Sequence, residues 1–290
     1  MRLARWQNEN GDAFGCVTAD KKLVDLTGVF GWQIPDVKSL IGAELPEADL
    51  ARKEKGRLGA AMVGTRWLPP VENPGKIICV GVNYPERNAE YKDGSDQPKF
   101  PSLFVRFPST FVGHEQPILR PRESEQFDYE GEIVLVIGKP GRRIAEADAL
   151  EHVFGVTLMN DGSVRDWIRH GKFNVTQGKN FEKSGSIGPW IVTREAAGDL
   201  NDLTVITRVN GEERQRGNTG TLLFPIARII AYVSTFITLE PGDLIATGTP
   251  PGSGARFEPP KWLKPGDVVE VECPQIGVLR NTVADEPAGA

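Results

Sequence analysis

Residues 128–132 read Asp-Tyr-Glu-Gly-Glu and run directly into an apolar stretch at 133–137. An apolar run of this kind is typical of a strand buried on both faces. Glu130 and Glu132 are two residues apart, and on a strand such residues point to the same face. Two carboxylates that close repel each other, and a bound cation is the usual way to offset the repulsion. The sequence therefore predicts a functional site at the edge of a buried strand.

The composition argues against several classes of protein. The formal charge is −5 and no basic block stands out, so nucleic acid is a poor candidate partner. The three cysteines are far apart without a CxxC pair, which disfavours disulfides and zinc sites and favours a cytoplasmic protein. The N-terminus lacks the apolar run of a signal peptide. The longest membrane candidate, residues 229–239, is too short to span a bilayer, and we predict a core helix there.

The first part of the chain is predicted to form a small accessory domain, residues 1–72. Short strands are expected at residues 3–6, 13–17 and 23–25. A stretch rich in Ala, Lys and Arg predicts a helix over 49–62, with Asp49 as its N-cap. Prolines and glycines between residues 68 and 75 then predict a boundary, after which residues 73–290 form a larger domain.

The larger domain is predicted to be rich in strands joined by many turns. Strands are expected at residues 76–82, 102–106, 127–137 and 153–159, and a helix at 146–152. The polar stretch from 83 to 100 predicts a long loop, and such loops in compact domains are often functional lids.

Asp161 follows the predicted strand at 153–159 and could supply a third carboxylate. Hard cations such as Mg²⁺, Mn²⁺ and Ca²⁺ bind to sets of oxygen ligands of this kind. Alternatively, each acid lies at the surface or forms a salt bridge, because Glu-x-Glu is common in exposed strands. Spacing alone leaves both interpretations open.

Several stretches, taken together and in order, resemble the fumarylacetoacetate hydrolase family, in particular its bacterial acylpyruvase and hydroxyhepta-diene-dioate isomerase-like members. The matching segments are 128–132 (DYEGE), 160–166 (NDGSVRD), 177–181 (QGKNF), 188–190 (GPW), 209–219, 247–252 (TGTPPG) and 263–272. The resemblance covers residues 76 to about 283. It implies an α+β, β-rich fold: a mixed β-sheet roll with flanking helices plus a small N-terminal domain. It also implies a homodimer.

The resemblance also implies a metal centre. A divalent cation, Mg²⁺ or Mn²⁺ with Ca²⁺ as a further option, would be held by Glu130, Glu132 and Asp161. Such a cation polarises a carbonyl group and stabilises the enolate that forms when a C–C bond breaks. Lys179 is expected to lie near the metal and to stabilise the developing negative charge.

The same resemblance suggests how the substrate, a small oxo-acid, is bound. Tyr84, Gln215 and Thr249 are expected to contact it, with the Thr249 hydroxyl and backbone N–H directed to a substrate carboxylate. The glycines around Thr249 allow close approach of the backbone. Read alone, this Gly/Pro-rich loop is also consistent with a simple turn.

The chain departs from the family at one position. The family phrase Asn-Tyr-x-x-His-x-x-Glu reads NYPERNAE at residues 83–90, so Arg87 replaces the histidine and Glu90 is retained. Arginine stays protonated and cannot act as a general base. Glu90 could serve as the base if burial raises its pKa. Alternatively, Arg87 could bind a second substrate carboxylate, or be a lid residue without a chemical role.

Three functions follow from this pattern. The first is a metal-dependent hydrolase that cleaves a C–C bond in an acylpyruvate or related β-diketo acid during aromatic-compound catabolism. The second is a metal-dependent decarboxylase or tautomerase of an oxo-dicarboxylate, which Arg87 favours because no activated water is needed. The third is a degenerate member that binds metal without catalysis. We expect the first, with the second as its main alternative.

Overall fold

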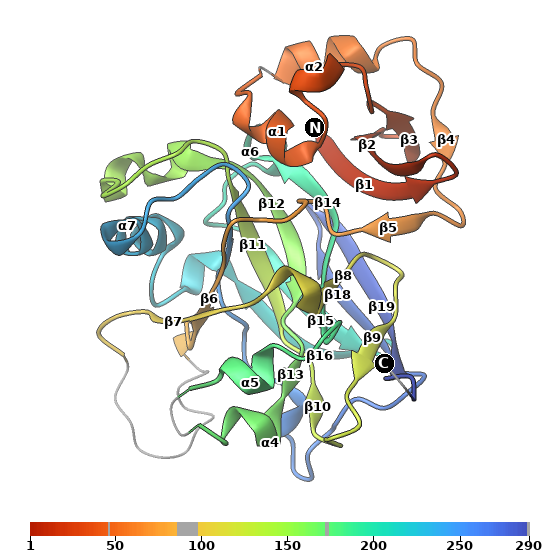
Figure 1. Cartoon of the computed structure of the whole chain (residues 1–290). Helices are drawn as coiled ribbons and strands as arrows, with labels where there is room; N and C mark the ends of the chain where they lie inside the picture. Colours follow the sequence, from red (N-terminus) through yellow and green to blue (C-terminus); the bar gives the residue numbers. More distant parts are fainter. Residues whose placement is uncertain (46, 86–97, 172–173, 289–290) are drawn as a thin grey trace.

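The computed structural model describes residues 1–45, 47–85, 98–171 and 174–288. Its main sheet contains strands β1 (Arg2–Asn8), β2 (Gly11–Val17), β3 (Lys22–Asp25), β4 (Ala60–Ala61), β5 (Arg66–Leu68), β6 (Ile77–Gly81), β7 (Ser102–Val105), β8 (Phe111–Val112), β11 (Gly131–Ile137), β12 (Val153–Asn160), β14 (Gly185–Thr193) and β17 (Leu244–Ala246). Their order is β4-β3-β2-β1-β14-β12-β11-β17-β6-β7, with β5 on β1 and β8 on β14 (Figure 1). The sheet is mixed, because β17 pairs with β6 in parallel and most other pairs are antiparallel.

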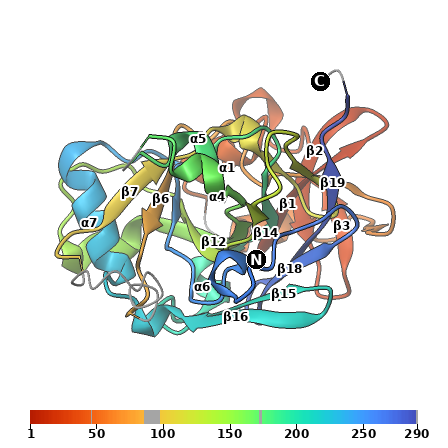
Figure 2. The same cartoon turned by 90° about the horizontal axis from the view of Figure 1, so that it is seen from below.

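A second sheet packs against the first. It contains β9 (Ile118–Arg120), β15 (Thr204–Val209), β16 (Glu212–Asn218), β18 (Val268–Cys273) and β19 (Gly277–Asp285), in the order β16-β15-β18-β19-β9. Figure 2 shows β15 and β16 as a separate layer below β12 and β14. A small pair, β10 (Phe127–Asp128) and β13 (Ser163–Val164), lies beside them. The β-rich α+β fold predicted from the sequence is confirmed.

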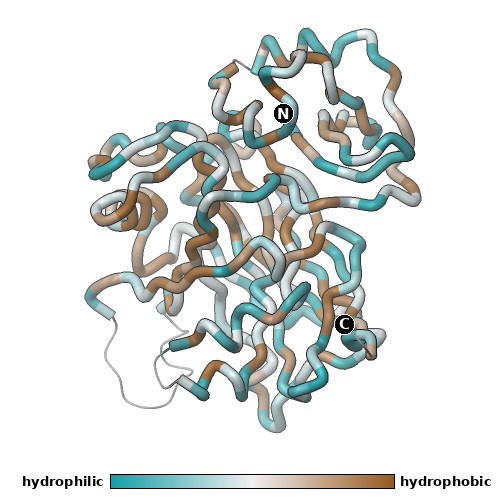
Figure 3. Tube along the Cα trace, in the orientation of Figure 1, coloured by the Kyte–Doolittle hydropathy of each residue, from teal (hydrophilic) through white to brown (hydrophobic). Residues whose placement is uncertain are grey.

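Strand β11 explains the apolar run at 133–137, because alternate residues pack into different cores. Ile133 and Leu135 belong to a cluster between the two sheets, which includes Val271. Val134 and Val136 belong to a cluster on the opposite face of the main sheet. Figure 3 shows hydrophobic residues gathered along the central strands. A strand buried on both faces must be apolar throughout, as the sequence predicted.

Helices flank the sheets and are short. The core helix predicted at 229–239 is present as α7 (Ile226–Phe236), which begins and ends three residues earlier. The helix predicted at 146–152 is the 3-10 helix Glu146–His152, which packs against α7. The other α-helices among the described residues are α1 (Val37–Gly42), α2 (Glu47–Glu54), α4 (Arg165–Ile168), α5 (Thr176–Lys179) and α6 (Arg194–Ala197). Short 3-10 turns lie at Gly31–Gln33, Pro108–Thr110, Thr219–Thr221 and Gly254–Arg256. In the part of the chain that the structure describes, no helix is long and apolar enough to cross a membrane.

The N-terminal lobe, the described residues before 73, joins the main sheet directly. Strand β1 pairs with β14 in antiparallel fashion, with Leu3 opposite Ile191. The helix predicted over 49–62 is wrong in its second half, because α2 ends at Glu54 and Ala60–Ala61 form β4. Gly56 adopts a φ of +80°, which favours glycine and stops the helix. The domain boundary after residue 72 stays a prediction.

Candidate active site

The three carboxylates singled out in the sequence lie together in the structure. Glu130, Glu132 and Asp161 each offer an oxygen, and these oxygens lie within 4.8 Å of one another. All three side chains are buried, and we refer to them as the carboxylate triad. The prediction that both glutamates lie on one strand is wrong, because the expected strand at 127–137 is divided into β10 and β11 and Glu130 lies between them.

The pairing of β11 with β12 brings the triad together. Gly131 lies opposite Asn160, so the residues just outside the ladder, Glu130 and Asp161, become neighbours. The Asp161 backbone N–H donates to the Glu130 carbonyl at 2.7 Å, and the Glu130 N–H donates to Asn160 Oδ1 at 3.0 Å. These bonds fix both acids at the end of the strand pair.

Gly131 separates the two glutamates for a packing reason. It faces the second sheet, and a Cβ atom at this position would lie 2.0 Å from Thr207 Oγ1. Real Cβ atoms do not approach other atoms that closely, so the second sheet admits only glycine here without movement. Glu132 follows on the strand and points to the opposite face. The Glu-Gly-Glu pattern thus reflects the contact between the sheets.

Two cations, the buried Lys179 and the half-buried Arg165, compensate two members of the triad. Lys179 at the end of α5 donates to Glu130 Oε2 at 2.6 Å and to Asp161 Oδ2 at 2.5 Å. Arg165 at the start of α4 donates to Glu130 Oε1 at 2.6 Å. Burial opposes the charged ammonium, but the charges of Asp161 and Glu130 outweigh it and raise the pKa of Lys179. Lys179 therefore stays protonated at neutral pH, as its predicted role requires.

Glu132 lacks such compensation. It accepts a hydrogen bond from the Gly248 backbone N–H at 2.9 Å, but among the described residues it has no ion-pair partner. Burial, and then the negative charges of Asp161 and Glu130, raise the pKa of Glu132 well above its ordinary value. A buried carboxylate without a cation is costly. Three converging carboxyl groups, one of them without an ion-pair partner among the described residues, fit a hard divalent cation such as Mg²⁺, Mn²⁺ or Ca²⁺.

A cavity of about 400 Å³ opens onto two members of the triad, Glu130 and Glu132, and we call it the triad cavity. Its walls come from β6, β7, α4, α5 and the loop after β17; they include Val80, Ser102, Phe104, Glu130, Glu132, Arg165, Ile168, Thr176, Lys179 and Thr249. Figure 1 shows α4 and α5 side by side near the ends of these strands. The cavity is large enough for a small organic acid and presents both cations and carboxylates to it.

The three predicted substrate-binding residues occupy different places. Thr249 lines the triad cavity, but its hydroxyl donates to the Gly131 carbonyl at 2.9 Å. The Gln215 amide accepts from the Gly131 N–H at 3.0 Å and donates to Thr249 Oγ1 at 2.9 Å and to the Pro250 carbonyl, so it ties the loop to β11. Tyr84 is buried, and its hydroxyl has no hydrogen-bond partner among the described residues. Substrate contact by these three stays a prediction.

Other parts of the site lie beyond the sequence prediction or beyond the described residues. Arg87 and Glu90, the predicted catalytic residues of the lid, fall outside the described ranges. Arg106, which pairs with Asp161 Oδ1 at 2.7 Å, was missed because no spacing connects it to the triad. Asp128 was quoted only as part of the motif; it accepts from Arg165 Nε and from the backbone N–H groups of Gly254 and Ala255.

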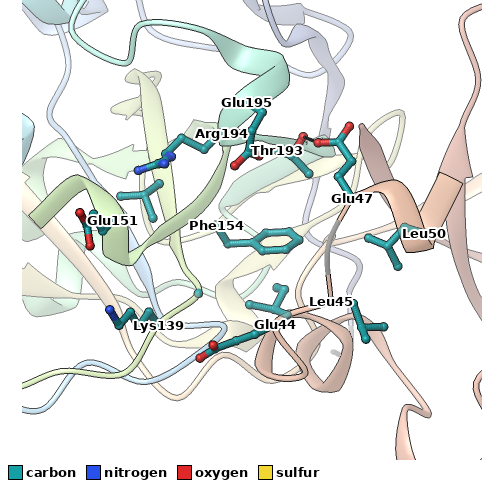
Figure 4. Close-up of a pocket in the computed structure, with 13 residues that line it drawn as sticks. Glu44, Leu45, Glu47, Leu50, Lys139, Glu151, Phe154, Thr193, Arg194 and Glu195 are labelled. Atoms are coloured by element: carbon teal, nitrogen blue, oxygen red, sulfur yellow. Dashed lines mark hydrogen bonds between the residues drawn. The ribbon is translucent and has the colours of Figure 1, made fainter.

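A second cavity, of about 270 Å³, lies between the N-terminal lobe and the ends of β12 and β14, and we call it the inter-lobe pocket. Figure 4 shows Phe154 at its centre, between Glu44 and Leu45 from one side and Thr193 and Arg194 from the other. Several acids line it, but within the described residues only the carboxylate triad brings three ligand oxygens close enough for a metal. Among the described residues, the candidate metal site is therefore the carboxylate triad and not the inter-lobe pocket.

Comparison with known proteins agrees with this geometry. The model for the family described as "Fumarylacetoacetate (FAA) hydrolase C-terminal" matches residues 76–284. The chain belongs to the fumarylacetoacetate hydrolase family. Within the family, it is 38% identical over 274 residues to the oxaloacetate tautomerase YisK of Bacillus subtilis, covering 91% of this chain and 90% of that protein. It is 43% identical over 218 residues to the mitochondrial oxaloacetate tautomerase fahd2 of Xenopus laevis, covering 74% of this chain and 67% of that protein.

Solved structures in the family cover nearly the whole chain. A fumarylacetoacetate hydrolase from Exiguobacterium antarcticum has a TM-score of 0.84 and 35% identity, over 99% of this chain and 100% of that one. A maleylpyruvate hydrolase from Sphingobium sp. SYK-6 has a TM-score of 0.81 and 28% identity with the same coverage. The N-terminal lobe, which carried little of the sequence resemblance, is included in both matches.

Proposed function

We propose that the protein is a divalent-metal-dependent tautomerase of oxaloacetate or a similar oxo-dicarboxylate. The structural observation that carries the metal-dependent part is the buried Glu132, which has no cation partner among the described residues. The similarity to YisK, which extends over nine tenths of both chains, supports the choice of reaction. The tautomerase alternative is therefore better supported than the C–C hydrolase that we expected first.

The described residues suit the interconversion of keto and enol forms. A divalent cation held by the carboxylate triad would polarise the 2-oxo group and stabilise the enolate form of the substrate. Lys179 lines the triad cavity, and its raised pKa keeps its ammonium group positively charged. This charge would lie beside the 2-oxo group of the bound substrate. A fixed ammonium in a site of low water content stabilises an enolate oxygen without rearranging.

The reaction also fits the departure from the family pattern. Tautomerisation moves one proton between carbon and oxygen of the substrate, so it consumes no water. Hydrolysis needs a base that activates water, and Arg87 stands where the family has that histidine. We propose that Arg87 binds to the second carboxylate of a dicarboxylate substrate and that Glu90 acts as the base. We also propose that the protein is a homodimer and that it is cytoplasmic.

A second candidate is hydrolysis of an acylpyruvate, which the structural similarity to a fumarylacetoacetate hydrolase and a maleylpyruvate hydrolase supports. Aromatic-compound catabolism belongs with this candidate. The two candidates share the metal and Lys179 and differ in whether a C–C bond breaks.

Product analysis by NMR distinguishes the candidates. The protein is freed of metal, supplied with Mg²⁺ or Mn²⁺, and incubated separately with oxaloacetate and with an acylpyruvate. We expect faster equilibration of the oxaloacetate enol and keto forms, abolished by a chelator. Two carboxylic acids from the acylpyruvate, without any effect on oxaloacetate, would replace the first candidate by the second. Pyruvate and CO₂ from oxaloacetate would instead indicate a decarboxylase.

A further inference from the structure

Arg106 contacts the carboxylate triad from outside the triad cavity. Its Nη1 donates to Asp161 Oδ1 at 2.7 Å and to the Gly162 carbonyl at 3.2 Å, and its Nη2 donates to Ser184 Oγ at 2.9 Å. The side chains of Arg106 and Asp161 both have an exposed fraction of 0%. The described residues that line the cavity do not include Arg106, so it acts on Asp161 rather than on a substrate.

The surrounding residues hold the guanidinium in one place. Its central carbon lies 4.4 Å from the centroid of the Phe111 ring, which covers it as a cation–π partner. A Cβ atom on Gly185 would come within 2.9 Å of Nη1, so the glycine leaves room for it. A planar guanidinium with acceptors on separate segments has little freedom to move. Arg106 is thus a fixed point for one oxygen of Asp161.

The two oxygens of Asp161 face different partners. Oδ2 shares the Lys179 ammonium with Glu130 Oε2, so Oδ2 is the oxygen turned toward the rest of the triad. Oδ1 is held by Arg106. A cation that binds to Asp161 through Oδ2 alone shares this oxygen with Lys179, whereas a cation that binds to both oxygens must also compete with Arg106 at Oδ1.

We propose that Arg106 is a positioning residue that keeps Asp161 a one-oxygen ligand and so favours Mg²⁺ or Mn²⁺ over Ca²⁺. Mg²⁺ demands a compact octahedral shell, whereas Ca²⁺ accepts more ligands and binds readily to both oxygens of a carboxylate. Loss of Arg106 frees Oδ1 for a two-oxygen contact that suits the larger ion. This inference rests on the proposed function, because it needs the triad to bind a divalent cation.

The test compares the affinities for Mg²⁺ and Ca²⁺ by calorimetry on metal-free wild type, Arg106→Met and Ser184→Ala. In Arg106→Met we expect the Kd for Mg²⁺ to rise about tenfold or more, as when an outer partner of a metal ligand is lost. The Kd for Ca²⁺ should rise less or fall, so the ratio of the Mg²⁺ Kd to the Ca²⁺ Kd rises. Ser184→Ala removes a contact of the same guanidinium but keeps the Asp161 pair, and its ratio should stay at the wild-type value.

The ratio separates positioning from simple electrostatics. Removing a positive charge changes the affinity for two ions of equal charge in the same sense and to a similar extent. An unchanged ratio in Arg106→Met therefore overturns the proposal. If that variant does not fold, Arg106→Lys is measured instead. Lysine keeps the positive charge but lacks the planar guanidinium group that donates to several acceptors, and the proposal requires the same rise in the ratio of the Mg²⁺ Kd to the Ca²⁺ Kd. Wild-type protein that binds neither ion would contradict the proposed metal-dependent function instead.

Discussion

The triad cavity and the inter-lobe pocket both carry charged side chains of both signs, but only one of them buries its acids. No residue of the triad is more than 5% exposed. In the inter-lobe pocket, Glu44, Glu151 and Glu195 are exposed to solvent. Water stabilises each exposed acid separately, whereas the buried acids depend on nearby cations. Burial and convergence, rather than the number of charges, distinguish the site suited to chemistry.

The largest expected difference between the two cavities comes from removing one acid from each. Glu132→Gln keeps the shape of the side chain but removes the ionisable carboxyl group, which has no ion-pair partner among the described residues. Because a bound metal supplies several kcal/mol of transition-state stabilisation, turnover should fall about 1,000-fold. Glu195→Gln in the inter-lobe pocket should leave turnover and Mn²⁺ binding unchanged. Equal losses in steady-state assays of both variants would break the comparison.

Matched lysines give the next largest difference. Lys179→Met removes the ammonium between Glu130 and Asp161, and we expect kcat to fall about 100-fold, as when one fixed donor is lost from an active site. Lys139→Met, at the exposed inter-lobe pocket, should leave kcat at the wild-type value. Measuring the Kd for Mn²⁺ in the same variant distinguishes an effect of Lys179 on metal binding from its effect on kcat. A normal kcat in Lys179→Met would remove this lysine from the mechanism.

A smaller effect, on stability, tests how the sheets shape the triad. Gly131→Ala places a methyl group 2.0 Å from Thr207 Oγ1, which forces the second sheet to move. We expect the free energy of unfolding to fall by about 1–3 kcal/mol, measured by urea denaturation. Adding Thr207→Ala should recover part of the loss, because it removes the clashing atom. If the double variant is as unstable as the sum of the single ones, the contact is not the cause.

The smallest effect concerns pH. The pKa of Glu132 lies above its usual 4.5, so the metal-free fold retains a proton that the unfolded chain loses. Its stability therefore falls as pH rises above 4.5 toward the folded-state pKa. A metal requires the ionised carboxylate, so the increase in Tm caused by Mn²⁺ should grow by a few degrees from pH 5 to pH 8. Glu132→Gln should flatten this trend, and an increase independent of pH in the wild type would contradict it.

Local patterns marked the three acids as candidates, and the family resemblance predicted that they act together as a triad. Glu130 and Glu132 precede an apolar run that is typical of a buried strand, and Asp161 follows a second apolar run of this kind. Antiparallel pairing of β11 and β12 then brings the three together. Among the cations beside the triad, Lys179 was predicted only through the family resemblance, and Arg106 was not predicted. Arg106 precedes Asp161 by 55 residues, and only the three-dimensional fold makes them neighbours.

Errors in the fold prediction also have local causes. The segment at 59–62 is rich in alanine and suits a helix, yet Leu23 and Lys22 pair with Ala60 and Ala61 as strands. Tertiary pairing outweighed the intrinsic preference of alanine. The strand expected at 127–137 is divided at Tyr129 and Glu130, whose backbone N–H groups donate to the side chains of Asp128 and Asn160. No pattern within 127–137 predicts a bond to Asn160, which lies 30 residues from Glu130.

The pairing of β1 with β14 has a consequence for how the chain could be shortened. Leu3 and Phe14 share a core with Val134 and Met159 of the main sheet. A chain begun at residue 73 would open this core to water and leave the backbone of β14 around Ile191 without its partner strand. Free strand edges beside exposed apolar surface recruit other chains. The N-terminal lobe thus covers an edge of the main sheet that would otherwise be free to pair with other chains. We expect a chain without this lobe to be insoluble, so that its activity could not be measured.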